Sequence, residues 1–170
     1  KIDYYGLAMR GHLTIVEGEY VRQEDVYDWF CEQAKKYEIV TIGYDPANAT
    51  RLRQMLEGRG FACEVVRQGP VTLNDPMKDI KELLLAGRVV SNRDPMLLWY
   101  TDNVRLSGER RHADKQNWMP TKRNKFRKID GFMAWLDAHC INMQKNPAGE
   151  IYHKPAVRVI DIRSRQRAAR

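Results

Sequence analysis

The sequence lacks the long apolar run that a membrane-spanning helix requires. No stretch of its 170 residues approaches about 18 uninterrupted apolar residues. The first ten residues, KIDYYGLAMR, also lack the basic and then apolar order of a secretory signal peptide. We therefore expect neither membrane insertion nor export. A single soluble domain is expected, because this length suffices for one packed core but scarcely for two.

Cysteine is scarce, and no nucleotide-binding loop is present. Cys31, Cys63 and Cys140 lie far apart, with no C-x-x-C pair and no histidines at metal spacing. This excludes a disulfide framework and predicts reduced, buried thiols in a cytosolic protein. No G-x-x-x-x-G-K-[ST] motif occurs, so ATP hydrolysis is not assigned to this chain.

Positive charge is concentrated in the last third of the chain. The net charge is +7, yet residues 105–128 alone carry nine Lys and Arg against two acids. Residues 145–170 carry seven bases against two acids, so the remainder of the chain is acidic. Clustered cations favour a polyanionic partner, nucleic acid first, since binding releases phosphate counterions. The alternative is a solvated loop followed by a disordered tail.

Hydrophobic periodicity predicts an α/β domain. A β-branched run at 38–44, a helix from about 49 to 58 and a strand at 61–66 have the spacing of a βαβ unit with parallel strands. Residues 107–126 lack periodicity and are predicted to form a loop. Strands are also predicted at 12–16 and 88–90, and helices at about 22–36, 76–87, 95–106 and 129–143.

Two aspartates occupy positions that suit catalysis. Asp45 directly follows a predicted buried strand, at the sheet edge where α/β proteins place ligands; its alternative role is to cap a helix starting at Pro46. Asp130 opens a predicted helix straight after the basic stretch, where an acid also favours the helix dipole. The adjacent Gly131 costs about 1 kcal/mol relative to alanine, which indicates a packing or functional reason.

Paired carboxylates beside a cationic segment are what two-metal phosphodiester hydrolysis requires. Carboxylates hold Mg²⁺ or Mn²⁺ ions about 3.5–4 Å apart, while cations bind the phosphate backbone. Such sites usually contain three or four acids. Asp102, Asp114 and Asp137 are candidates for a further contact, although Asp137 is interpreted as a helix-surface residue.

A series of short motifs resembles the C-terminal nuclease domain of tailed-phage terminase large subunits. The run TIGYDPANAT at 41–50 resembles the "gyDpwnAt" segment of that family. The resemblance covers roughly residues 10–140. Further matches follow in the family's order: EVVRQG at 64–69, PMK at 76–78, GRV at 87–89, NRDPMLLW at 92–99, NV at 103–104, PTK at 120–122 and RKIDG at 127–131.

The resemblance implies a ribonuclease H-like fold, with a mixed central sheet flanked by helices and incomplete at its N-terminus. It implies a partial nuclease domain over residues 1–144. The prolines and scattered arginines that follow predict a basic, mostly disordered tail over 145–170. Asp45 and Asp130 match catalytic, metal-binding acids of the family, with Mg²⁺ or Mn²⁺ as cofactor. The family's first acid and its ATP-hydrolysing motor lie upstream of anything present here, so we expect a truncated piece of a longer protein with weak activity of its own.

The resemblance further implies cleavage of double-stranded concatemeric viral DNA during genome packaging, in the host bacterial cytoplasm. The portal protein and the small terminase subunit are possible partners. Alternatives are a non-catalytic DNA-binding or assembly module, and another ribonuclease H-like nuclease such as a recombinase or resolvase. Trp118, an aromatic among cations, is a candidate for stacking on an unpaired base. The candidate DNA-binding residues are Lys115, Lys122, Arg123, Lys125, Arg127 and Lys128.

Overall fold

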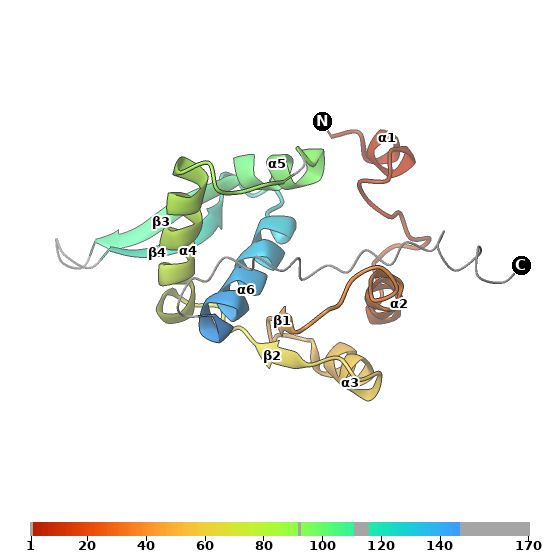
Figure 1. Cartoon of the computed structure of the whole chain (residues 1–170). Coiled ribbons are helices and arrows are strands. Elements are labelled where there is room, and N and C mark those ends of the chain that lie inside the picture. The colour runs from red at the N-terminus through yellow and green to blue at the C-terminus, as the bar shows by residue number, and fades with distance from the viewer. Residues whose placement is uncertain (1, 92, 111–115, 147–170) are drawn as a thin grey trace, which may run out of the picture.

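A computed structural model describes residues 2–91, 93–110 and 116–146, in which helices surround two small sheets (Figure 1). Within these residues no helix is both long enough and apolar enough to cross a membrane. The elements in chain order are α1 (Tyr4–Met9), α2 (Gln23–Gln33), β1 (Ile42–Tyr44), α3 (Thr50–Gly58), β2 (Cys63–Val65), α4 (Pro70–Leu85), α5 (Pro95–Asp102), β3 (Val104–Arg110), β4 (Gln116–Lys122) and α6 (Asp130–Lys145).

The predicted βαβ unit is confirmed. β1 and β2 pair in parallel, with Ile42 opposite Cys63 and Tyr44 opposite Val65, and α3 connects them. The pairing continues beyond the strands, because Val66 N–H donates to the Tyr44 carbonyl at 2.8 Å. The carboxyl ends of both strands therefore meet at one edge of this sheet.

The core lies between α4, α6 and the first sheet. Leu73 and Ile80 of α4 and Leu136 of α6 are almost fully buried. Cys140 lies in the same cluster, and burial raises the pKa of its thiol to about 11, so it stays protonated at neutral pH. This agrees with the predicted buried thiol, whereas Cys31 and Cys63 are only partly buried.

The predicted loop at 107–126 is wrong, because most of this segment belongs to an antiparallel hairpin. β3 and β4 pair from Val104 opposite Lys122 to Arg110 opposite Gln116. The hairpin lies along α4 (Figure 1), and Trp118 N–H donates to Asn74 Oδ1 at 2.8 Å. The Trp118 ring packs against the core, with the Lys81 ammonium 4.6 Å from its centroid. These contacts remove Trp118 as a candidate for base stacking.

Two predicted strands are absent, and two predicted helices have different ends. Residues 12–16 and 88–90 form no strand, since among the described residues neither run pairs with a strand. α4 begins at Pro70 and contains Pro76 in its interior, where Pro76 is buried in the core. α5 ends at Asp102, because the chain enters β3 two residues later.

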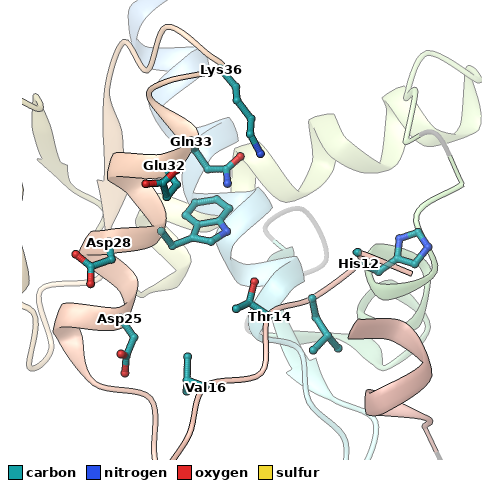
Figure 2. Close-up of a pocket in the computed structure, with 11 residues that line it drawn as sticks. His12, Thr14, Val16, Asp25, Asp28, Glu32, Gln33 and Lys36 are labelled. Atoms are coloured by element: carbon teal, nitrogen blue, oxygen red, sulfur yellow. The ribbon is translucent and has the colours of Figure 1, made fainter. Parts of the chain in front are cut away.

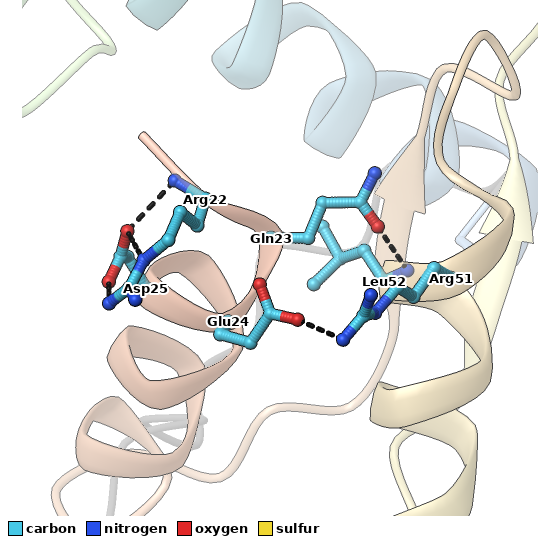
Figure 3. A network of polar contacts seen from close by, with 6 residues as sticks. All are labelled: Arg22, Gln23, Glu24, Asp25, Arg51 and Leu52. Carbon is cyan, nitrogen blue, oxygen red and sulfur yellow. Dashed lines mark hydrogen bonds and ion pairs between the residues drawn. The ribbon is translucent and has the colours of Figure 1, made fainter. Parts of the chain in front are cut away.

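Helix α2 contacts α3 through polar side chains, and its Phe30 ring lies 6.4 Å from the Phe61 ring. None of its residues is buried, and Trp29 is 50% exposed. A pocket of about 640 Å³ separates α2 from the segment at 11–16 (Figure 2). On its other side, Glu24 pairs with Arg51 and Gln23 Oε1 accepts the Leu52 N–H at 2.9 Å (Figure 3). These contacts fix α2 against the start of α3.

Candidate functional site

Asp45 lies at the carboxyl edge of the parallel sheet, as predicted. It directly follows β1 and is exposed. Its Oδ1 accepts the Ala47 N–H at 3.0 Å, which makes a local turn. The alternative cap at Pro46 is wrong, since α3 begins at Thr50 and its N-cap is Ala49. The carboxylate therefore stands at the sheet edge without serving as the cap of the following helix.

The connection after Asp45 is held by the α2 side chain Gln23. Gln23 Nε2 donates to the Asn48 carbonyl at 2.8 Å, while its Oε1 receives the Leu52 N–H described above. Asn48 itself has a left-handed backbone with φ of 56°, a conformation that asparagine tolerates better than most residues. Gln23 thus braces the turn that leads away from Asp45.

The structure brings Asp137 of α6 to the same edge as Asp45. Gly43 permits this approach, because a Cβ there would lie 2.8 Å from Ile141 Cγ1 and 3.0 Å from the Asp137 carbonyl oxygen. Gln68, three residues after β2, donates from Nε2 to Asp137 Oδ1 at 3.0 Å. Three parts of the fold therefore meet here: the end of β1 brings Asp45, the segment after β2 brings Gln68, and α6 brings Asp137.

Asp137 is buried, so its interpretation as a helix-surface residue is wrong. Only 8% of the residue is exposed. Burial raises the pKa of its carboxyl, the negative charge of Asp45 raises it further, and the Gln68 hydrogen bond opposes both. The available signal was its phase on the helix, since it lies four residues after Met133 and four before Ile141, both apolar.

Asp130 lies on the same helix as Asp137 but does not adjoin it. It is exposed at the first position of α6, seven residues before Asp137, which corresponds to about 10 Å along the helix axis. Close packing explains the glycine at the neighbouring position 131, because a Cβ on Gly131 would lie 2.3 Å from Tyr100 Cδ2. Burial, and then the charge of Asp130, raises the pKa of the Tyr100 phenol.

Within the described part of the chain, Asp102 does not complete a metal site. Asp102 lies 3.8 Å from Arg123 in an exposed ion pair, and Asp114 lies outside the described residues. Across residues 2–91, 93–110 and 116–146, no group of three or more His, Cys, Asp or Glu side chains is arranged to hold a metal ion. Asp45 and Asp137 are therefore the carboxylates that the sheet edge brings together.

The predicted basic residues gather at one end of the hairpin. Lys122 is the last residue of β4, and residues 123–128 form an exposed loop that leads into α6. Asn103, 1% exposed, accepts the Arg123 N–H on its carbonyl and donates from Nδ2 to the Lys128 carbonyl, each at 2.8 Å. Lys115 lies outside the described residues. Arg123, Lys125, Arg127 and Lys128 are all carried by this one loop.

Comparisons with known proteins agree on one family. A family model described as "Terminase large subunit, endonuclease domain" matches residues 1–145. The fold is similar to the crystal structure of the HK97 bacteriophage large terminase, with a TM-score of 0.71 at 18% sequence identity. That match covers 81% of this chain and 28% of the HK97 chain. No curated protein matches the chain. The predicted ribonuclease H-like α/β class is confirmed, although the described strands form two separate two-stranded sheets.

Proposed function

Because this chain belongs to the family of terminase large subunit endonuclease domains, we propose that it cuts double-stranded concatemeric viral DNA, with divalent metal ions, during genome packaging. The observation that carries the proposal is an exposed carboxylate, Asp45, at the carboxyl edge of a parallel sheet. A cationic loop ends at the helix that Asp130 opens. This family membership favours a terminase over a recombinase or resolvase.

The chemical type of the available ligand atoms suits a hard divalent cation. Asp45 and Asp130 are exposed carboxylates, and carboxylate oxygens are the ligands that Mg²⁺ and Mn²⁺ prefer. We propose that these two residues hold the metal. When bound, the ions would activate a water nucleophile and stabilise the leaving oxygen. With so few acidic ligands, Mn²⁺ is favoured over Mg²⁺, which demands stricter octahedral geometry.

The chain's own residues supply position and charge. The Ala47 N–H orients the Asp45 carboxylate, and Gln23 braces the turn behind it. Lys122, Arg123, Lys125, Arg127 and Lys128 would bind DNA phosphates without reading sequence. The portal protein and the small terminase subunit remain predicted partners, and action on viral DNA would take place in the host bacterial cytoplasm.

Plasmid nicking tests the proposed function. We expect the 170-residue chain to nick supercoiled plasmid slowly with millimolar Mn²⁺, more slowly still with Mg²⁺, and not at all with excess EDTA, because the acids act only through bound metal. The measurement is conversion of supercoiled to open-circular DNA over time. Nicking that persists unchanged in EDTA would overturn the metal assignment. Absence of both nicking and DNA binding would overturn the proposed function.

The basic loop is expected to set the salt dependence of DNA binding. Replacing Lys122, Arg123 and Lys125 together by alanine should reduce the slope of log K against log salt by about 2–3, if each contacts a phosphate. Fluorescence anisotropy with a duplex oligonucleotide at several salt concentrations measures this slope. The matched control removes three exposed cations elsewhere, with Lys35, Lys36 and Arg59 replaced by alanine. Equal slopes for the two triple variants would exclude the loop as the phosphate-binding surface.

A further inference from the structure

The basic loop carries an aromatic side chain that the fold leaves uncovered. Phe126 is 81% exposed, although it lies only four residues before Asp130. Its nearest recorded ring partner is a cation, since Lys125 Nζ lies 5.0 Å from its centroid. Arg127 follows it directly. Other large apolar side chains are exposed as well, but this ring stands out because it lies between two cations on the basic loop and is open to a ligand.

The loop presents this ring in a defined position. Asn124 Oδ1 accepts the Phe126 N–H at 3.0 Å, and the Asn124 carbonyl accepts the Arg127 N–H at 3.1 Å. The buried Asn103 binds the backbone at both ends of the loop, at Arg123 and Lys128, as described above. The ring therefore projects from a turn closed at both ends by hydrogen bonds.

The cations beside the Phe126 ring indicate what kind of ligand it would bind. Cations precede and follow Phe126, so the ligand must offer negative charge on both sides of a flat apolar surface. Nucleic acid has this arrangement, because phosphates flank each base and every base has a π-face. An acidic protein surface supplies the charge but no regular flat apolar surface between its charges. The arrangement therefore favours a nucleobase as the partner of the ring.

We propose that Phe126 stacks on a DNA base next to the cleavage site, while the flanking cations bind the adjacent phosphates. The proposal rests on the proposed function and names a contact within it. An aromatic ring can stack on an unpaired base or wedge into a base step of a duplex. Both are contacts with the π-face of a base, and the two DNA substrates used below distinguish them.

Binding measurements with the full chain test this contact. Phe126→Ala is expected to weaken DNA binding about tenfold, as loss of one base–aromatic stack does, with an unchanged salt slope because no charge is removed. Phe126→Leu should lose most of the same affinity, and Phe126→Trp should retain it. The matched control is Tyr5→Ala, which removes another exposed aromatic, on α1. Anisotropy with single-stranded and duplex oligonucleotides in EDTA gives all affinities, and circular dichroism confirms the fold.

Each outcome bears on the proposal. A loss confined to single-stranded DNA supports stacking on an unpaired base, and a loss on duplex as well supports a base-step wedge. Wild-type affinity in Phe126→Leu, or a reduced salt slope in Phe126→Ala, would overturn stacking. Unchanged affinity in Phe126→Ala overturns it too, while the proposed function stands if the parent chain still binds and nicks DNA. A parent chain that binds no DNA overturns stacking, and one that also fails to nick DNA overturns the proposed function as well.

Discussion

Asp45→Asn and Asp130→Asn are each expected to reduce Mn²⁺-dependent DNA cleavage at least about 100-fold while leaving DNA affinity within about twofold. An asparagine keeps the size of the side chain but removes the charge that holds a divalent ion. Loss of several kcal/mol of metal-dependent transition-state stabilisation reduces the cleavage rate by at least this factor. The exposed loop at 123–128, which we propose binds the DNA phosphates, is untouched by either change. Plasmid nicking measures the rate and anisotropy measures binding.

Asp137→Asn provides the matched control on the same helix. Asp137 is buried and bonded to Gln68, so an amide at that position fills the same space, and we expect more cleavage than in Asp130→Asn. The reverse order would move the metal site from Asp130 to the carboxylate beside Asp45. Parental cleavage rates in both Asp45→Asn and Asp130→Asn, with contaminating nuclease excluded, would show that the two carboxylates have only local structural roles.

The parts of the site predicted from sequence depend on neighbours in the chain. Asp45 is predicted at the sheet edge because a β-branched run ends immediately before it. The helical spacing between the runs at 38–44 and 61–66 predicts parallel strands, which the structure forms at 42–44 and 63–65. The apolar periodicity of residues 129–143 likewise predicts the start of α6. Local patterns of this kind survive folding when the core reinforces them.

The parts that sequence reasoning missed depend on contacts between distant residues. The β3–β4 hairpin is polar and includes Pro120, so its sequence shows no alternation of apolar and polar residues that would predict strands. Each strand is stabilised by pairing with the other. Asp137 is buried because Gln68, 69 positions away, bonds it and Gly43 lets the helix approach. The helical phase of Asp137 with Met133 and Ile141 indicates the core face, but nothing next to it in the sequence indicates either contact.

Gly43 is the residue on which this placement of Asp137 depends, and Gly43→Ala should therefore be strongly disruptive. Its Cβ would meet Ile141 Cγ1 at 2.8 Å, the Asp137 carbonyl oxygen at 3.0 Å and Val66 Cγ2 at 3.2 Å. Since these contacts come from the helix and from the neighbouring strand, β1 and α6 must separate. We expect a loss of about 1–3 kcal/mol in the free energy of unfolding, measured by urea denaturation, and reduced cleavage from a shifted sheet edge.

Gly58→Ala is the control for the backbone effect of adding a methyl group. Gly58 is in α3, with no atom within 4 Å of the added Cβ, so this change should be neutral or stabilising by up to about 1 kcal/mol. A second arm combines Gly43→Ala with Ile141→Ala. If crowding is the cause, Gly43→Ala should cost less in that background, because the nearest clashing atom is gone. Equal costs for Gly43→Ala and Gly58→Ala would mean that α6 does not press on β1 at this point, and the pairing of Asp137 with Asp45 would fail with it.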